Sequence, residues 1–355
     1  MQTPRPTLQD LGWNHFFQQQ LELDELETLV PLRVFSLSRH LLETVGVDGP
    51  RQLTMPLAWQ RLESEELPTV GDWLLVEPES GEPQRILERK SLFKRMASGR
   101  ETRVQLMGAN VDTLFVVTSC NRDFNLSRIE RYLALALDAE VDPVLVLTKV
   151  DLCEEFSPFV EQARTLRPGL DVVALNAKDG AGIEALRPWL GTGQTAALVG
   201  SSGVGKSTLV NALCAEEVQL TGEIRETDAK GRHTTTGRSL HLLPEGGLLL
   251  DSPGMRELQL SDCEGGVASL FDDLEELARQ CRFNDCRHQG ETGCAIQAAS
   301  DAGQLDARRL SNYLKLRDEQ ERLAQTLVEK RRKDKSFGKM VKRAMADKKR
   351  EEGEY

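Results

Sequence analysis

The sequence contains no long hydrophobic run. No apolar stretch approaches the roughly 20 residues that a membrane-spanning helix requires, and the opening segment 1–5 lacks the apolar core of a secretory signal peptide. These two absences argue against an integral membrane protein and against a secreted one. We therefore expect a cytoplasmic protein with no membrane contact.

An excess of positive charge is also missing. The 355 residues carry a formal net charge of −11, and 28% of them are charged. A net acidic chain does not coat nucleic acid uniformly, although a local basic patch on it can still bind phosphate groups. The length suffices for two or three domains with at least one sizeable hydrophobic core.

The seven cysteines do not predict a disulfide framework, because a reducing compartment disfavours one. Four of them lie among apolar or acidic neighbours, as packing cysteines do: Cys120, Cys153, Cys214 and Cys263. The other three cluster around a histidine, in the set Cys281, Cys286, His288 and Cys294. Three thiolates and one imidazole form a closed tetrahedral set that suits one structural zinc ion. A coincidental group of reduced cysteines is the alternative.

The most informative stretch is a glycine-rich segment with the pattern G-x-x-x-x-G-K-[ST]. It follows an apolar run at 195–199, a predicted strand, and precedes a predicted helix at 209–213, which is the context that a nucleotide phosphate-binding loop needs. Backbone N–H groups and the helix N-terminus would hold the phosphates. The side chain of Lys206 would reach the β- and γ-phosphates, and the Ser207 hydroxyl would bind Mg²⁺. The predicted phosphate-binding residues are Gly200, Ser201, Ser202, Gly203, Val204, Gly205, Lys206, Ser207 and Thr208.

Two loops earlier in the chain resemble the base-recognition loops of GTPases. The first, Thr148, Lys149, Val150 and Asp151, follows a predicted strand and is similar to the guanine-specificity motif N-K-x-D. The resemblance implies that Asp151 accepts hydrogen bonds from guanine, while the stem of Lys149 lies over the base. Thr148 replaces an asparagine that braces the phosphate loop, and a hydroxyl supplies only part of that bracing. The second loop, Asn176, Ala177 and Lys178, resembles the loop whose backbone contacts guanine O6.

The order of these motifs is reversed relative to ordinary GTPases, because base recognition precedes the phosphate loop. The chain therefore resembles a circularly permuted GTPase with an α/β fold. Segment 230–236 is similar to a first switch, in which Thr235 would complete the Mg²⁺ shell. The pattern D-S-P-G then predicts that Asp251 binds the metal through water and that the Gly254 N–H contacts the γ-phosphate. Met255 stands where Ras-like enzymes carry a water-orienting glutamine, so His233 is our candidate catalytic group, with Lys206 and Gly254. A plain surface histidine is the alternative for His233.

The region before these motifs has the texture of a small β-barrel. Short predicted strands at 33–37, 51–55, 72–76, 84–87 and 103–106 are separated by turn residues and lack helical periodicity, which favours a barrel of the oligonucleotide-binding (OB) kind. Basic residues gather around Phe93 in it: Arg85, Arg89, Lys90, Lys94, Arg95, Arg100 and Arg103. They indicate either phosphate contact with base stacking or a solvated loop.

Together these motifs resemble the RsgA family of circularly permuted, ribosome small-subunit-dependent GTPases, over residues 32–316. The resemblance implies a cytoplasmic GTP hydrolase that binds the 30S subunit and its rRNA during late maturation and is stimulated there. It also implies that the barrel and the zinc domain both touch rRNA. We expect a monomer that uses one structural Zn²⁺, and Mg²⁺ with GTP, and that releases GDP.

The resulting prediction is a multi-domain chain. It has an N-terminal extension at 1–31, an OB-like β-barrel at 32–108, a circularly permuted P-loop GTPase domain at 109–260, a mostly helical zinc-binding domain at 261–330 and a basic C-terminal arm at 331–355. The arm would contact nucleic acid or be a solvated tail. Two other functions stay open: a permuted GTPase acting on another RNA or on the large subunit, and a nucleotide-regulated zinc scaffold with little turnover.

Overall fold

The computed structural model describes residues 5–38, 40–96, 104–214, 238–252 and 263–323. The chain divides into two compact units, Met1–Gln259 and Leu260–Tyr355, which are described separately below. Among the helices in the described ranges, none combines the length and the apolarity needed to cross a membrane.

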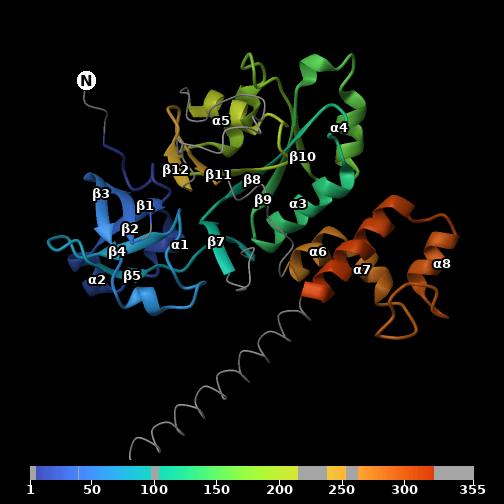
Figure 1. Ribbon diagram of the computed structural model, residues 1–355, viewed down its shortest axis with the longest axis horizontal. Coiled ribbons are helices and arrows are strands. Elements are labelled where there is room, and N and C mark those ends of the chain that lie inside the picture. The colour runs from blue at the N-terminus through green and yellow to red at the C-terminus, as the bar shows by residue number, and fades with distance from the viewer. Residues whose placement is uncertain (1–4, 39, 97–103, 215–237, 253–262, 324–355) are drawn as a thin grey trace, which may run out of the picture. The chain divides into compact units, whose positions relative to one another are not determined.

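The α/β part of the first unit is built on a sheet with the order β10-β9-β8-β11-β13-β12, in which β12 is antiparallel to its neighbour β13 and the other pairs are parallel. Figure 1 shows β8, β9 and β11 side by side with α5 above them. The central strands β8, β9 and β11 are nearly continuous buried apolar runs, as a sheet covered on both faces requires. The strands of this part are β8 (Thr113–Ser119), β9 (Asp142–Thr148), β10 (Asp171–Ala174), β11 (Thr195–Val199), β12 (Ser239–Leu242) and β13 (Leu248–Asp251).

The sheet has a topological switch point between β8 and β11. From β8 the chain moves outward through β9 to β10, and it then returns to the other side of β8 to form β11 and β13. In open α/β sheets the loops at such a point diverge and leave a crevice at the carboxyl ends of the strands, where ligands bind. This fold therefore places the loop after β11 at the expected binding position.

Helices lie in the connections between β8, β9, β10 and β11 and directly after β11, whereas a turn at 243–247 joins β12 to β13. The helices are α3 (Leu126–Asp138), η2 (Val150–Leu152), α4 (Ser157–Arg164), η3 (Ile183–Trp189) and α5 (Lys206–Cys214). One face of the sheet packs against α5 and η3, with Phe115, Val146, Leu186 and Leu209 in a common buried cluster. Successive residues of a strand point to opposite faces of the sheet, so both faces of these apolar strands need a cover. The helix α3 also contributes to this cover, since it contacts β8 and β9.

The N-terminal strands continue the same sheet. β1 pairs with β2 and β4, and at Ser36 it also pairs with Ser239 of β12. Within the described residues, β3 pairs only with β2, β5 pairs only with β4, and β6 and β7 form a separate ladder. The predicted closed barrel is therefore not confirmed. The strands are β1 (Val30–Ser38), β2 (Leu41–Gly46), β3 (Gly49–Thr54), β4 (Trp73–Val76), β5 (Pro83–Ile86), β6 (Leu92–Met96) and β7 (Val104–Ala109), with the short helix η1 (Trp59–Arg61) between β3 and β4.

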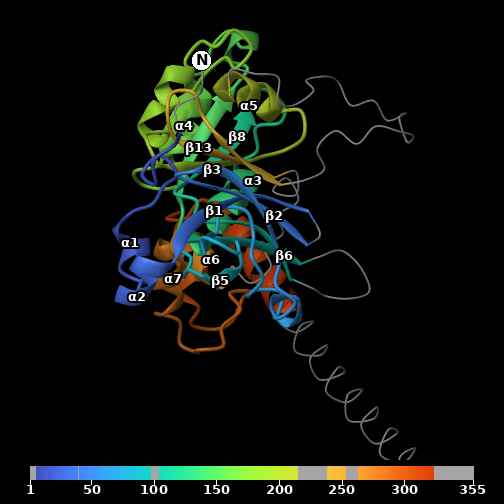
Figure 2. The ribbon, with the colours of Figure 1, turned by 90° about the vertical axis from the view of Figure 1, so that its left-hand side faces the viewer.

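The N-terminal extension packs on these strands through aromatic side chains. Its two short helices, α1 (His15–Gln18) and α2 (Leu23–Thr28), lie together at one side of β1 (Figure 2). Phe17 is buried against Trp73, and the ring of Trp13 meets that of Trp73 edge-on at 4.9 Å. This contact excludes water from the outer side of β4.

A buried arginine joins four segments of the first unit. The Arg33 side chain donates hydrogen bonds to the carbonyl oxygens of Leu11 (2.5 Å), Gly71 (3.3 Å) and Asn110 (3.0 Å) and to the Thr195 hydroxyl (2.9 Å). Burial lowers the pKa of its guanidinium to about 10. The Arg33 guanidinium thus connects β1 by hydrogen bonds to the N-terminal extension, to the residues just before β4 and β8, and to the first residue of β11.

The basic run of the N-terminal region is engaged largely within the protein. Four of its cations lie in ion pairs: Arg85 with Glu25, Arg89 with Asp72, Lys90 with Asp112 and Lys94 with Glu65. Phe93 is only 2% exposed. The interpretation of Phe93 as a base-stacking platform is therefore wrong, because its ring faces the protein interior. Arg100 and Arg103 lie outside the described residues.

The described part of the second unit is helical. It contains α6 (Glu264–Leu270), α7 (Asp272–Ala278), α8 (Ala295–Asp301) and a helix over 307–323. Phe271, Leu274, Ile296 and Tyr313 are buried in it. Between α7 and α8 the chain forms loops and turns, and this stretch carries the cysteine cluster.

Candidate nucleotide and metal sites

The predicted phosphate loop connects β11 to the N-terminus of α5. Gly200 has a φ of 148°, and a Cβ atom there would lie 2.1 Å from the Val117 carbonyl oxygen, so no side chain fits. Lys206 is 7% exposed, and its ammonium donates hydrogen bonds to the carbonyl oxygens of Gly200 (2.6 Å) and Ser201. The loop is thus wrapped around the lysine that would reach the phosphates.

The first base-recognition loop is bonded directly to the phosphate loop. The Thr148 hydroxyl lies 2.5 Å from the Val204 carbonyl oxygen, and the Lys149 ammonium donates to the Gly203 carbonyl oxygen at 2.7 Å. The sequence predicts that the Thr148 hydroxyl supplies part of the bracing of the phosphate loop, and its contact with the Val204 carbonyl is one such bracing contact. Asp151 follows in η2 and is exposed, so its carboxylate is accessible to a base.

The second base-recognition loop is folded by its own side chains. The Asn176 side chain accepts from the Lys178 N–H (3.1 Å) and donates to the Asp179 carboxylate (2.9 Å). Asn176 and Ala177 are buried, whereas Lys178 is exposed. Since β9 and β10 are parallel neighbours, the two loops leave the same edge of the sheet.

Two of the three predicted magnesium ligands lie at this edge. Ser207 is in the first turn of α5, and Asp251 is the last residue of β13. Ala197 of β11 pairs with Leu250 of β13. Asp251 is therefore level with Leu198, two residues before Gly200, the first residue of the phosphate loop. The third ligand, Thr235, and the candidate catalytic groups His233 and Gly254 lie outside the described residues.

Sequence reasoning missed a contact from α3 to the phosphate loop. Arg128 donates a hydrogen bond to the Ser201 hydroxyl at 2.6 Å. The signal that could have found it is topological: α3 follows β8, which lies next to β11 at the switch point.

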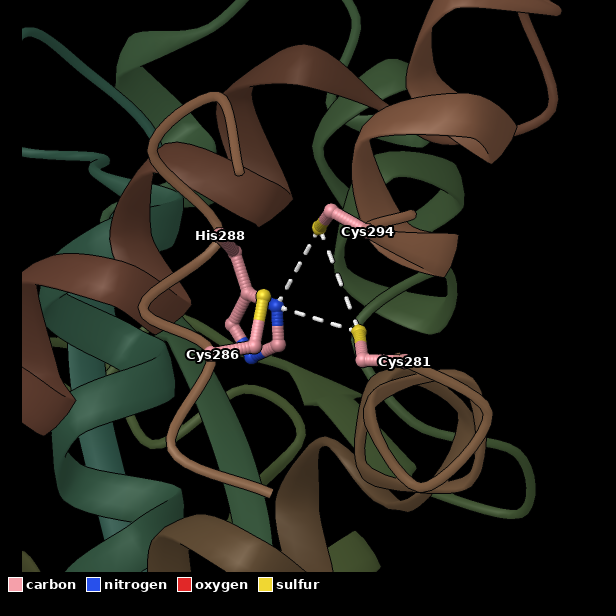
Figure 3. A group of neighbouring side chains, drawn as sticks. All are labelled: Cys281, Cys286, His288 and Cys294. Atoms are coloured by element: carbon pink, nitrogen blue, oxygen red, sulfur yellow. Dashed lines mark hydrogen bonds between the residues drawn. The ribbon is translucent and has the colours of Figure 1, made fainter. Parts of the chain in front are cut away.

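The second unit brings the cysteine cluster together. The ligand atoms of Cys281, Cys286, His288 and Cys294 all lie within 4.8 Å of one another, and Figure 3 shows them pointing toward a common centre. Two tetrahedral ligands at about 2.3 Å from zinc are about 3.8 Å apart. The Cys281 and Cys294 sulfurs are 4.0 Å apart, and His288 Nδ1 lies 3.6 and 3.4 Å from them. These residues therefore fit a metal ion.

The surroundings of the cluster favour the ligand forms of His288 and Cys281, whereas burial raises the pKa of the Cys286 thiol to about 11. Burial lowers the pKa of His288, and the positive charge of Arg317 acts in the same direction, which keeps the imidazole neutral. Burial opposes ionisation of Cys281. Hydrogen bonds from the backbone N–H groups of Ala295 and Ile296 and from the Cys286 and Cys294 side chains together outweigh it and lower the pKa of this thiol. A thiolate and a neutral imidazole are the forms that bind metals.

A parallel sheet with a phosphate loop at its switch point, and with base-recognition loops earlier in the chain, defines a circularly permuted GTPase. The sequence model of the RsgA GTPase family matches residues 86–261. The small ribosomal subunit biogenesis GTPase RsgA 2 of Vibrio parahaemolyticus is 49% identical over 98% of this chain and 95% of its own length, and its RsgA counterpart of Mesorhizobium japonicum is 50% identical over 88% and 90%. The chain belongs to the RsgA GTPase family and is a GTP hydrolase.

Solved structures agree with the fold. The crystal structure of YjeQ from Thermotoga maritima is 26% identical, covers 81% of this chain and 97% of its own, and superposes with a TM-score of 0.59. YloQ, described as a circularly permuted GTPase, is 21% identical with a TM-score of 0.58, and it covers 83% and 96%. The model of ABC transporters also matches, over residues 186–346. That stretch includes the phosphate loop but leaves out Thr148–Asp151, the base-recognition loop.

Proposed function

We propose that this chain hydrolyses GTP on the small ribosomal subunit during the late maturation of that subunit. Binding to the subunit stimulates the rate of GTP hydrolysis. The hydrogen bonds from Thr148 and Lys149 to the phosphate loop carry the proposal, because they unite base recognition and phosphate binding in one site. Relatives about half identical to the chain are named small ribosomal subunit biogenesis GTPases.

In this site each predicted group has one task. Asp151 and the 176–178 loop select guanine, and residues 200–208 hold the phosphates. Mg²⁺ is bound by Ser207, Thr235 and Asp251 when GTP is present, and it neutralises charge on the phosphates. His233 orients the attacking water, and the Gly254 N–H senses the γ-phosphate.

The remaining roles concern RNA and metal. The cysteine cluster holds one structural zinc ion, and the β1–β7 strands belong to an OB-like module that contacts rRNA together with the zinc domain. The protein acts as a monomer in the cytoplasm, where ribosomal subunits mature. Support comes from the Cys₃His donor set and from the names of the relatives.

Asp151→Asn should shift specificity from guanine to xanthine nucleotides. The amide cannot accept both guanine hydrogens, but it offers a donor to the carbonyl that xanthine carries instead. The loss of two charge-assisted hydrogen bonds should weaken GTP binding by at least about 100-fold, measured by calorimetry against XTP. Asp142→Asn, at the opposite end of β9, is the matched control and should bind GTP normally. Equal affinity of the native protein for ATP and GTP would disprove guanine selection.

The decisive experiment measures GTP hydrolysis alone, with small subunits and with large subunits. Intrinsic turnover should be slow because Met255 cannot orient water, and small subunits should raise it by at least about 100-fold. His233→Ala should remove most of this stimulation. Equal stimulation by large subunits would indicate the other particle as target, and absence of turnover in every case would indicate a nucleotide-regulated scaffold.

A further inference from the structure

The first turn of α3 lies at the switch-point crevice but belongs to none of the motifs described above. The phosphate loop follows β11, and α3 begins after β8, so the first turn of α3 faces the phosphate loop across this crevice. Arg128 lies in that turn, which the Asn125 side chain caps by accepting the Arg128 N–H. Its own side chain is exposed and extends to the Ser201 hydroxyl at 2.6 Å.

A second residue of α3 holds the same serine. Tyr132 lies one helical turn after Arg128, on the same face of the helix. It is 8% exposed, and its hydroxyl is hydrogen-bonded to the Ser201 side chain. Ser201 accepts a hydrogen bond from the Arg128 guanidinium and is also hydrogen-bonded to Tyr132, so two residues of α3 contact the same serine of the phosphate loop.

Two cations converge on Ser201. The Lys206 ammonium bonds to its carbonyl oxygen, and the Arg128 guanidinium bonds to its hydroxyl. In phosphate loops of this pattern the lysine reaches the β- and γ-phosphates. The Ser201 end of the loop is therefore the γ-phosphate end, and Arg128 lies beside it with an exposed and extendable side chain.

We propose that Arg128 is a catalytic residue that binds the γ-phosphate of GTP and stabilises its charge during hydrolysis. The proposal rests on the proposed function. The water oxygen forms a bond to the γ-phosphorus as the bond to the β–γ bridging oxygen breaks, which yields GDP and inorganic phosphate, and the water proton passes to phosphate and solvent. Negative charge on the transferring group is neutralised by a guanidinium, whose planar donors match phosphate oxygens.

The proposed role of Arg128 would compensate for the absence of the water-orienting glutamine of Ras-like enzymes. Met255 replaces the usual glutamine, so positive charge at the γ-phosphate must supply more of the rate enhancement. An arginine provided within the same chain is one of the ways in which GTPases supply it. Arg128 comes from the base-recognition half of the permuted chain, whereas the phosphate loop comes from the later half.

The test compares GTP and GDP in Arg128→Ala and Arg128→Lys. In single-turnover assays, with and without small subunits, Arg128→Ala should lower kcat about 10³-fold, and lysine should restore part of it. GDP affinity should stay unchanged, because GDP lacks the γ-phosphate, whereas binding of GDP with aluminium fluoride should be lost. Arg122→Ala removes an exposed cation from the loop before α3 and is the matched control, with turnover unchanged.

Three results would overturn the inference. Undiminished turnover in Arg128→Ala would remove the residue from catalysis, and so would an equal loss in Arg122→Ala, which would show only a general charge effect. Equal weakening of GTP and GDP binding would mean that Arg128 only shapes the loop through Ser201. A native protein without GTP hydrolysis would overturn the proposed function as well, so the two failures are distinguishable.

Discussion

Loss of zinc is expected to unfold the cysteine-bearing part of the second unit. Cys286→Ser should release the metal, because a hydroxyl is a poor replacement for a thiolate ligand. The loops between α7 and α8 bury few side chains of their own, and structural zinc supplies on the order of 10 kcal/mol of binding free energy to such segments. Elemental analysis should give one zinc per native chain, and limited proteolysis should cut the variant between residues 281 and 294.

A matched variant separates the metal from general packing. Cys263 is a buried cysteine of the same unit that lies outside the cluster, so Cys263→Ala should keep its zinc and its resistance to protease. A chelator should reproduce the effect of Cys286→Ser in the native protein, and zinc should reverse it. Native protein that contains no zinc, or a zinc-free variant with unchanged protease resistance, would contradict the assignment.

Arg33→Met should lower the melting temperature of the first unit by about 10 °C. Methionine fills much of the volume, but it leaves the buried carbonyl oxygens of Leu11 and Asn110 and the Thr195 hydroxyl without their arginine donor. Each such unsatisfied group costs about 1–3 kcal/mol, whereas the Gly71 carbonyl keeps its hydrogen bond from the Asn110 amide. Removal of a desolvated charge offsets part of this loss. A net cost of about 3–5 kcal/mol corresponds to such a shift in a unit of this size.

The location of the damage is a further readout. Since Arg33 bonds to the Leu11 carbonyl, protease should release the N-terminal extension of Arg33→Met earlier than that of the native chain. Among the described residues, the Arg51 side chain on β3 makes a long hydrogen bond to the Pro78 carbonyl oxygen (3.4 Å) at the surface, so Arg51→Met should change the melting temperature by less than about 2 °C. An Arg33 variant as stable as this control would show that the buried network contributes nothing.

The features that the sequence predicted are local ones. A phosphate loop is one continuous segment whose glycines and lysine act on a shared ligand, so spacing alone locates Lys206. The same holds for Asp151. Permutation also follows from sequence, because it is the order of local motifs along the chain. His233 stays a prediction, since it lies outside the described residues.

What the sequence could not predict depends on partners far away along the chain. Arg33 looks like an ordinary strand residue, and nothing local indicates that residues 11, 71, 110 and 195 surround it. The basic run around Phe93 was ambiguous for the same reason, because its carboxylate partners come from other segments. β2 was missed as a strand, since its pairing with β1 and β3 defines it.

The permuted strand order also governs how the chain can fold while it is synthesised. β8 and β9 are complete well before β11, because residues 149–194 must first be translated, which takes roughly 2–9 s at about 5–20 residues per second. During that interval β8, all of whose residues end up buried, has one paired edge and one open edge, and an open apolar edge invites association with other chains. The nascent protein therefore completes the loops that we propose to recognise guanine first, and it gains the proposed phosphate-binding loop only when β11 closes that edge.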